Sequence, residues 1–280
     1  ELSKAVPALA RVYPNGMADV NHFHAAGGLG FVISQLLDAG LLHEDVQTIL
    51  GAGLRNFCRE PFLKGGELEW RDAPAESLDA DIVRPASDPF DAEGGLRLVT
   101  GNVGRAIVKV SAVAPEHYSI KAPARVFSSQ AAFTQAFNDG ELETDFVAVL
   151  PGQGPRANGM PELHKLTPYL GVLQNRGFKV ALLTDGRMSG ASGKVLAAIQ
   201  VTPESLAGGI IGKIRDGDMV TIDANSGAMV VDAEDIETRP TPDADIANRQ
   251  VGMGRELFTA FRERSEGAEQ GAGIFTVAGA

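Results

Sequence analysis

The spacing of apolar residues changes about a third of the way along the chain. In the first part, the apolar residues of Leu2–Val12 and Phe31–Leu37 recur at helical intervals, and Gly40 ends the second of these segments. Asp45–Leu50 continues the helical pattern, whereas residues 64–86 are polar, acidic and rich in Ala, Pro and Asp, as a linker or surface loop is. We therefore predict a mostly helical segment over residues 1–85 and a domain boundary near residue 85.

The pattern after residue 85 favours a different architecture. Short apolar runs of β type alternate with glycine-rich turns, and amphipathic helices lie between them. The run KIRDGDMVTID is interpreted as a strand pair around an Asp-Gly turn. These patterns predict a mixed α/β fold, with a barrel-like sheet and a few helices over residues 86–280. The predicted strands are Leu96–Thr100, Ala106–Val113, Phe146–Leu150, Lys179–Thr184 and Met219–Ile222, and the predicted helices are Gln130–Asn138, Met160–Asn175 and Gly254–Glu266.

Composition limits the possible partners and the compartment. The 280 residues include 25 basic and 36 acidic ones, and the resulting net charge of -11 argues against a nucleic-acid partner. No apolar run approaches the ~20 residues of a membrane helix, so no membrane partner is expected. Cys58 is the one cysteine, which excludes an internal disulfide and fits a reducing cytoplasm. The chain begins at Glu1 without an initiator methionine, and we expect it to be a piece of a longer protein.

The glycine-rich turn LLTDGRMSGASGK, Leu182–Lys194, is the segment best suited to ligand binding. Its glycines let the backbone approach a ligand closely, and Arg187 offers a planar fork for a carboxylate or phosphate. The residues alone leave a tight structural turn as the alternative. A serine hydrolase is disfavoured, because Ser189 stands one place later than the Gly-x-Ser-x-Gly arrangement requires. The candidate residues of this turn are Thr184, Asp185, Arg187, Ser189, Gly190 and Ser192.

The loop GQGPRANGMPELHK is the second candidate segment. Its glycines predict a flexible loop that opens a helix near Pro161 and Glu162. Arg156, Asn158 and Lys165 at such a helix start would suit the phosphate or carboxylate of a ligand. A capped loop with solvated charges is the alternative.

The residues that most often bind metals give no site in this sequence. His22 and His24 are two residues apart, and such a pair does not share a helix face. Cys58 is interpreted as a small buried hydrophobic residue, because free cysteines are most often of that kind. We therefore assign no metal ligand in this chain.

The segment TDGRMSGASGKVLAAIQVTPES resembles the second signature of the dihydroxyacid and phosphogluconate dehydratase family. The resemblance extends through YPNGMADVNHFHAAGG, DAGLLHEDV, GNVGRAIVK, GQGPRANGMPELHKL, KIRDGDMVTID and VGMGRELF, and so covers essentially the whole chain. The segments NHFHAAGG and PRANGMPELHK are similar to the phosphogluconate branch of the family rather than to its amino-acid branch. Gln153 departs from the amino-acid branch, which has a metal-binding glutamate at that position, so no metal role is transferred to it.

The resemblance implies a hydro-lyase that converts 6-phospho-D-gluconate to 2-dehydro-3-deoxy-6-phosphogluconate and water in the Entner-Doudoroff pathway. It implies that Ser189 acts as an alkoxide base on the C2 proton, while a metal centre withdraws the C3 hydroxyl. The substrate-binding residues implied or indicated by the turn and the loop are Thr184, Asp185, Arg187, Gly190, Ser192, Arg156 and Asn158.

The resemblance also implies an iron–sulfur cluster, with magnesium as a second candidate metal. The family's cluster cysteines lie in an amino-terminal half, so this chain corresponds to the carboxy-terminal half and is predicted to be inactive alone. Residues 1–85 would be the helical remnant of an αβα domain, and residues 86–280 a swivelling β-barrel-like (β/β/α) domain. A phosphorylated sugar acid is the implied ligand and a homodimer the implied full-length state. A non-catalytic binding module, and a dehydratase of a non-phosphorylated sugar acid or dihydroxy acid, remain as alternatives.

Overall fold

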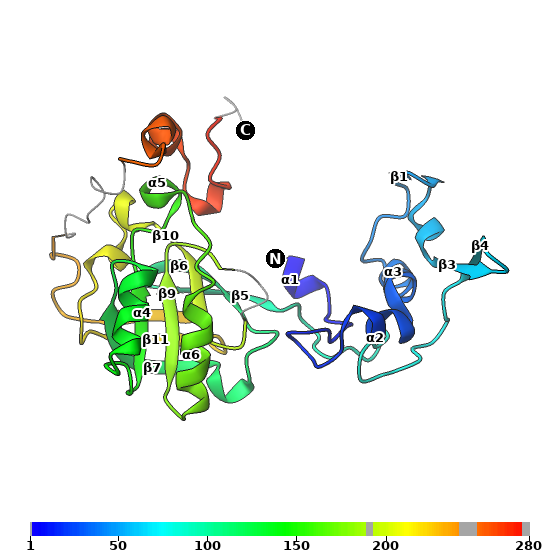
Figure 1. Ribbon diagram of the computed structural model, residues 1–280, viewed down its shortest axis with the longest axis horizontal. Helices are drawn as coiled ribbons and strands as arrows, with labels where there is room; N and C mark the ends of the chain where they lie inside the picture. Colours follow the sequence, from blue (N-terminus) through cyan, green and yellow to red (C-terminus); the bar gives the residue numbers. More distant parts are fainter. Residues whose placement is uncertain (1, 189–192, 241–250, 276–280) are drawn as a thin grey trace. The chain divides into compact units, whose positions relative to one another are not determined.

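The computed structural model describes residues 2–188, 193–240 and 251–275. Contacts between residues divide the chain into two compact units, Glu1–Gly95 and Leu96–Ala280, and Figure 1 draws the first in blue and cyan. The assignment of residues 1–85 and 86–280 to two family domains stays a prediction. None of the described helices is long and apolar enough to cross a bilayer.

The first unit combines short helices and two β-hairpins around a small core. The helix α2 (Val20–Ala25) begins after Asp19, whose carboxylate accepts the backbone N–H of His22 at 2.9 Å and so caps the free helix end. The core consists of Phe31 from the next helix packed with Ala26 and Val83. The other elements of the unit are α1 (Leu2–Ala5), α3 (Gly28–Asp38), β1 (Gln47–Thr48), β2 (Gly51–Ala52), the 3-10 helix η1 (Leu54–Phe57), β3 (Arg59–Lys64) and β4 (Glu67–Asp72).

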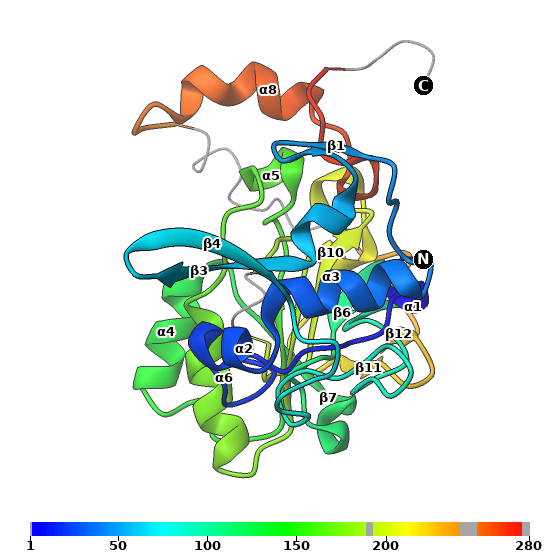
Figure 2. The ribbon, with the colours of Figure 1, turned by 90° about the vertical axis from the view of Figure 1, so that its right-hand side faces the viewer.

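Three predictions for this unit were wrong, and the unit is not mostly helical. The helical pattern of Leu2–Val12 forms a helix only over Leu2–Ala5, because Ala8 and Ala10 form isolated β-bridges with Asp91 and Val83. Asp45–Leu50 is not helical, because the Thr48 hydroxyl accepts the backbone N–H of Leu50 and donates to the carbonyl of Gly51, which closes the β1–β2 turn. The predicted linker from residue 64 onwards begins as a hairpin, since Gly65 and Gly66 both have positive φ and form the tight turn between β3 and β4. Figure 2 shows this hairpin as a twisted two-stranded ribbon.

The second unit is a closed eight-stranded barrel, and the predicted mixed α/β fold with a barrel is confirmed. Its strand order is β10-β6-β5-β12-β11-β7-β8-β9. The pairs β7–β8, β8–β9 and β9–β10 are parallel. The strands are β5 (Leu96–Gly101), β6 (Gly104–Lys109), β7 (Ser119–Val126), β8 (Phe146–Leu150), β9 (Val180–Thr184), β10 (Ala197–Thr202), β11 (Met219–Asp223) and β12 (Ala228–Asp232).

Helices cover one side of the barrel and its ends. Figure 1 shows α4 and α6 beside each other across β9, and the two helices contact one another. The helices of this unit are α4 (Gln130–Asn138), α5 (Pro155–Asn158), α6 (Leu166–Asn175) and α8 (Thr259–Arg264), together with the 3-10 turns η2 (Pro115–His117), η4 (Ser205–Ala207), η5 (Ile210–Lys213), η6 (Arg255–Phe258) and η7 (Ala268–Gln270).

Strands β8 and β9 are buried along their whole length, which explains their continuous apolar sequences. Side chains such as Val147 and Leu183 point into the core inside the barrel, while Phe146 and Leu182 belong to a second core that includes residues of α4 and α6. A strand with apolar packing on both faces cannot alternate polar and apolar residues. The two cores thus fix β8 and β9 as the rigid centre of the unit.

Four predicted elements of the barrel unit differ from the structure by more than one residue at an end. The strand predicted over Ala106–Val113 is β6 and ends at Lys109, because Val110–Val113 forms a turn. Of the run KIRDGDMVTID only Met219–Asp223 is a strand, because Lys213 ends η5 and Asp216 accepts the backbone N–H of Val126 at the turn. The helix predicted over Met160–Asn175 begins only at Leu166. The predicted helix Gly254–Glu266 is divided into η6 and α8.

Candidate functional site

The loops that follow β7, β8 and β9 meet at one edge of the barrel. These strands are parallel, so their carboxyl ends lie together, and ligands of parallel sheets commonly bind outside such ends. The loop after β8 holds α5, and the turn after β9 begins with Asp185 and leads toward Ser189. Both segments singled out in the sequence therefore lie at the same edge.

Asp185 anchors this edge from inside. The residue is fully buried, and its carboxylate accepts the backbone N–H groups of Gly152 at 3.1 Å, Gln153 at 2.8 Å and Ser205 at 2.9 Å. Three hydrogen bonds from backbone N–H groups to one side chain hold the two loops in fixed positions. The geometry gives Asp185 a positioning role, and its substrate contact stays a prediction.

The side chain of Thr184 also holds this turn through hydrogen bonds to the backbone. Its hydroxyl donates to the carbonyl of Leu150 at 2.7 Å and accepts the N–H of Gly186 at 3.0 Å, and the residue is fully buried. A Cβ on Gly186 would lie 2.7 Å from the Cβ of Gln153, so only glycine fits between the two loops. The turn after β9 is thus held against the loop after β8, and substrate contact by Thr184 stays a prediction.

Arg187 points away from the buried anchor and is half-exposed. Its Nε donates to the carbonyl of Met160 at 2.8 Å, and its Nη1 lies 2.9 Å from the Glu162 carboxylate. The carbonyl of Arg187 also accepts the N–H of Leu163 at 3.1 Å. Arg187 therefore joins the turn to residues 160–163, and its guanidinium already has an anionic partner.

Arg156 and Asn158 stand on the short helix α5. The Nε of Arg156 donates to the carbonyl of Ser265 at 2.7 Å. The amide of Asn158 donates to the side-chain oxygen of Gln153 at 2.9 Å, and its oxygen accepts a hydrogen bond from the guanidinium of Arg255. The structure thus brings Asn158 together with Gln153 and with Arg255, which sequence reasoning did not single out.

Glu204 is a second buried carboxylate that holds this edge in place. It was not selected as a site residue in the sequence analysis. Its carboxylate accepts the backbone N–H groups of Arg156 and Ala157, each at 3.1 Å, and a Cβ on Gly154 would collide with it. Burial raises the pKa of Glu204, against the lowering effect of these two hydrogen bonds. Glu204 lies at the end of the segment that resembles the family signature, but it was not selected as a site residue because an acid after Pro203 is typical of a protein surface.

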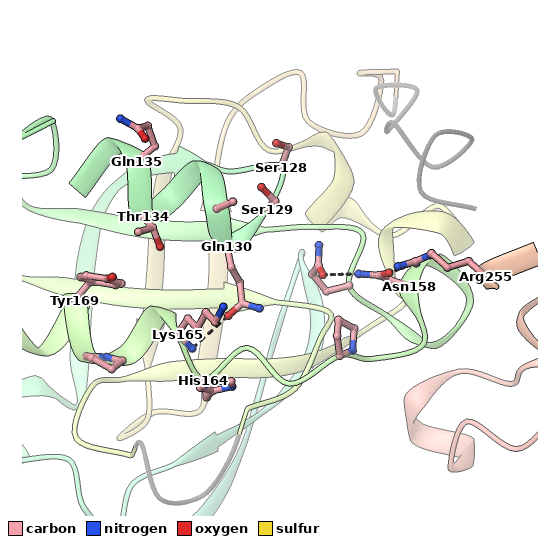
Figure 3. A pocket seen from close by; sticks show the side chains of 14 residues that line it. Ser128, Ser129, Gln130, Thr134, Gln135, Asn158, His164, Lys165, Tyr169 and Arg255 are labelled. Carbon is pink, nitrogen blue, oxygen red and sulfur yellow. Dashed lines mark hydrogen bonds between the residues drawn. The ribbon is translucent and has the colours of Figure 1, made fainter. Parts of the chain in front are cut away.

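A hollow of about 1000 Å³ opens at this edge between α4, α6 and the loop of α5. Figure 3 shows its wall, in which side chains from three separate stretches of the chain converge. Its polar lining includes Gln130, Gln153, Asn158, His164, Lys165 and Arg255. The hollow joins Asn158 and Lys165 of the second predicted segment, whereas Arg156 and Arg187 do not line it.

The predicted base, Ser189, lies outside the described residues, as do Gly190 and Ser192. The helix start predicted at Pro161 and Glu162 is absent, because Glu162 forms an isolated bridge with Arg187 instead. The anion site predicted there therefore lacks its helix.

The described residues do not fit an iron–sulfur cluster. No three of their His, Cys, Asp or Glu side chains are grouped as metal ligands would be. The only cysteine in the sequence, Cys58, is half-buried, and burial raises its pKa, which disfavours the thiolate that a cluster requires. The ring of His22 lies 2.8 Å from the Asp19 carboxylate that caps α2.

Comparison with known proteins identifies the family. Residues 81–272 match the profile described as Dihydroxy-acid/6-phosphogluconate dehydratase C-terminal, and residues 1–57 match the corresponding N-terminal profile. The chain is 60% identical over 99% of its length to a phosphogluconate dehydratase of Pseudomonas aeruginosa and 54% identical over 98% to that of Rhizobium meliloti. It is 35% identical over 86% of its length, and 41% of the relative's, to a dihydroxy-acid dehydratase of Sulfurisphaera tokodaii. The chain spans 46% of the length of each of the first two relatives. It belongs to the dihydroxy-acid/6-phosphogluconate dehydratase family.

Proposed function

We propose that this chain is the carboxy-terminal part of a phosphogluconate dehydratase, a hydro-lyase of the Entner-Doudoroff pathway. The reaction would remove water from 6-phospho-D-gluconate to give 2-dehydro-3-deoxy-6-phosphogluconate. The observation that carries the proposal is the identity of 60% over nearly the whole chain to a phosphogluconate dehydratase, against 35% to a dihydroxy-acid dehydratase. The anchored edge beside a hollow with basic side chains supports the same substrate class.

The proposed base is Ser189, which follows Arg187 by two residues in the turn after β9. Asp185 and Thr184 fix the start of this turn, so the proposed role of the described residues is to present the serine at the edge. A serine hydroxyl is too weak an acid to lose its proton unaided at neutral pH. The cation that would stabilise the alkoxide is not Arg187, whose charge is paired with Glu162.

The cofactor proposal follows from the chemistry of the described residues. Because the described residues do not fit a cluster, we propose that an iron–sulfur cluster, and magnesium if it takes part, binds to polypeptide other than these residues. We accordingly expect the 280-residue chain alone to be inactive. A phosphorylated sugar acid is the proposed ligand, and a homodimer is the proposed state of the whole enzyme.

The test is turnover of 6-phospho-D-gluconate by the full-length enzyme and its Ser189→Ala variant. Loss of a positioned base costs about 10²- to 10⁴-fold, so we expect kcat to fall by at least that range. Ser226→Ala, in the exposed turn between β11 and β12, is the matched control and should keep normal activity. A wild-type enzyme without activity on this substrate would refute the function, and near-normal turnover by Ser189→Ala would refute the base.

A further inference from the structure

The hollow at the barrel edge has a positive lining in an acidic protein. The chain has 36 acidic residues and a net charge of -11, yet none of the 14 residues that line the hollow is Asp or Glu. Lys165 and Arg255 both line it, and His164 adds a third group that can carry positive charge. A local lining of this kind favours an anionic ligand, because net charge does not describe one pocket.

The two cations of the hollow have no anionic partner among the described residues. Arg125, Arg176 and Arg187 each lie within 3.3 Å of a carboxylate, which neutralises them. By contrast, no described carboxylate lies within ion-pair distance of Lys165 or Arg255. Arg255 bonds the neutral amide of Asn158, and its buried Nε has no hydrogen-bond partner within the described part of the chain.

The positions of the cations are fixed by the surrounding structure. The side chain of Gln130, the first residue of α4, accepts the backbone N–H of Lys165 at 3.2 Å and donates to the carbonyl of Glu162 at 3.3 Å. This bridge holds the segment that carries Lys165 against the start of α4. Both α4 and α6 begin at the hollow, and their partial positive ends add to the attraction for an anion.

Lys165 and Arg255 lie on different sides of the hollow. Figure 3 shows Lys165 with Gln130 on one side and Arg255 with Asn158 on the other. The side with Asn158 also holds Gln153, whose backbone is bonded to Asp185 at the start of the serine turn. A planar guanidinium can bind a carboxylate through two parallel hydrogen bonds, so Arg255 suits the carboxylate end of a substrate, and Lys165 is left for its other end.

We infer that the hollow binds a sugar acid with an anion at each end, Arg255 receiving the carboxylate and Lys165 the phosphate. This inference rests on the proposed function and deepens it, because it makes Lys165 the residue that selects a phosphorylated over a non-phosphorylated acid. A lysine suits this role as a point charge that contacts phosphate oxygens.

The test measures binding and turnover with two ligands that differ only in the phosphate. For the full-length enzyme and for this chain, the affinities for 6-phospho-D-gluconate and D-gluconate are measured by calorimetry or by competition, with ³¹P line broadening as a second signal. Lys165→Met should weaken 6-phospho-D-gluconate about 10- to 100-fold and leave D-gluconate unchanged, as expected for loss of one charge-assisted contact. Arg255→Met should weaken both ligands.

Two controls keep the result interpretable. Lys165→Arg retains the charge and should keep the phosphate affinity within a few-fold, and Lys121→Met removes an exposed lysine on β7 without effect. Equal weakening of both ligands by Lys165→Met, or no weakening, would overturn the inference. Wild-type turnover of 6-phospho-D-gluconate decides the proposed function separately, since a phosphate site elsewhere would leave that turnover intact.

Discussion

Replacement of Asp185 by asparagine tests whether this carboxylate holds the candidate site together. The side chain keeps its size, and only the negative charge and one acceptor atom are lost. In the wild-type protein one oxygen accepts from Gly152 and Ser205, and the other accepts from Gln153. Asparagine can keep the first two bonds only if its NH₂ group faces the N–H of Gln153, where donor meets donor.

The magnitude follows from these three bonds. One buried N–H without a partner costs about 1 to 3 kcal/mol, and two bonds that change from charged to neutral lose about 1 kcal/mol each. Burial of the neutral asparagine side chain costs less free energy than burial of a carboxylate, and this difference offsets part of the loss of stability. We therefore expect Asp185→Asn to lower the free energy of unfolding of the barrel unit by about 3 kcal/mol.

The assay is urea unfolding followed by far-ultraviolet circular dichroism, combined with amide hydrogen exchange. The exchange pattern is the sharper measurement, because the Gln153 amide should lose protection while Gly152 and Ser205 keep most of theirs. Asp139→Asn is the matched control, since Asp139 is exposed at the end of α4 and bonds only the Gln135 side chain and backbone. That variant should stay within about 0.5 kcal/mol of the wild type.

A loss of less than about 1 kcal/mol for Asp185→Asn, with unchanged protection of the Gln153 amide, would refute this reasoning. It would mean that the loops after β8 and β9 hold their positions without the carboxylate. Full-length Asp185→Asn should in addition lose activity with little change in the affinity for 6-phospho-D-gluconate, because the residue positions the serine turn and does not line the hollow.

Three further predictions concern charges elsewhere in the chain. Burial is the largest influence on the pKa of Asp218 and raises it, but the hydrogen bonds from Arg239 and from the backbone N–H of Arg215, with the charge of Arg239, together lower the pKa below 3.8. These contacts therefore stabilise the fold above pH 3.8, and their contribution disappears as the pH falls through the lowered value. Urea midpoints of Arg239→Met should show less of this loss. Burial raises the pKa of Glu204 above 4.5, so stability should fall as the pH rises from 4.5 through the raised value, and Glu204→Gln should remove that slope. Burial raises the pKa of Cys58, so this thiol should react with a disulfide reagent more slowly than free cysteine at pH 8, and equal rates would contradict its buried state.

Part of the barrel could be predicted because its sequence signals and its environment agree. The predicted strand Phe146–Leu150 and the predicted helix Gln130–Asn138 match the structure residue for residue. The strand is apolar throughout because it is packed on both faces, and the helix begins after Ser129, whose hydroxyl caps it. Local pattern and tertiary packing point to the same element in both cases.

The elements that were missed or misplaced in the sequence analysis depend on contacts with distant parts of the chain. β7 was not predicted, since Pro123 and the exposed residues Ser119 and Lys121 interrupt its apolar pattern, although its buried residues alternate regularly. The helix α6 begins later than its apolar spacing suggests, because Leu163 and Glu162 are bound to Arg187 from another loop. A pattern within one segment carries no information about such partners.

The site shows the same limit. Both candidate segments of the sequence lie at one edge of the barrel, and the side chains of Asp185 and Thr184 bind the protein backbone there. Glu204 and Arg255 lie in segments that resemble the family, but no local pattern singles out either residue, and Arg255 bonds Asn158 from almost a hundred residues along the chain. A ligand wall that is assembled from distant segments becomes visible only in three dimensions.

The arrangement of charge at this edge resolves an apparent conflict between an acidic protein and an anionic ligand. Asp185 and Glu204 lie close to the hollow, but both are buried and each is surrounded by backbone N–H groups that compensate its charge. The cations of the hollow, Lys165 and Arg255, are by contrast not compensated by any described acid. The negative charges therefore shape the loops from inside, while the positive charges face the space that a ligand would fill. An anion can bind here because the nearby carboxylates are already satisfied by the amides that they hold in place.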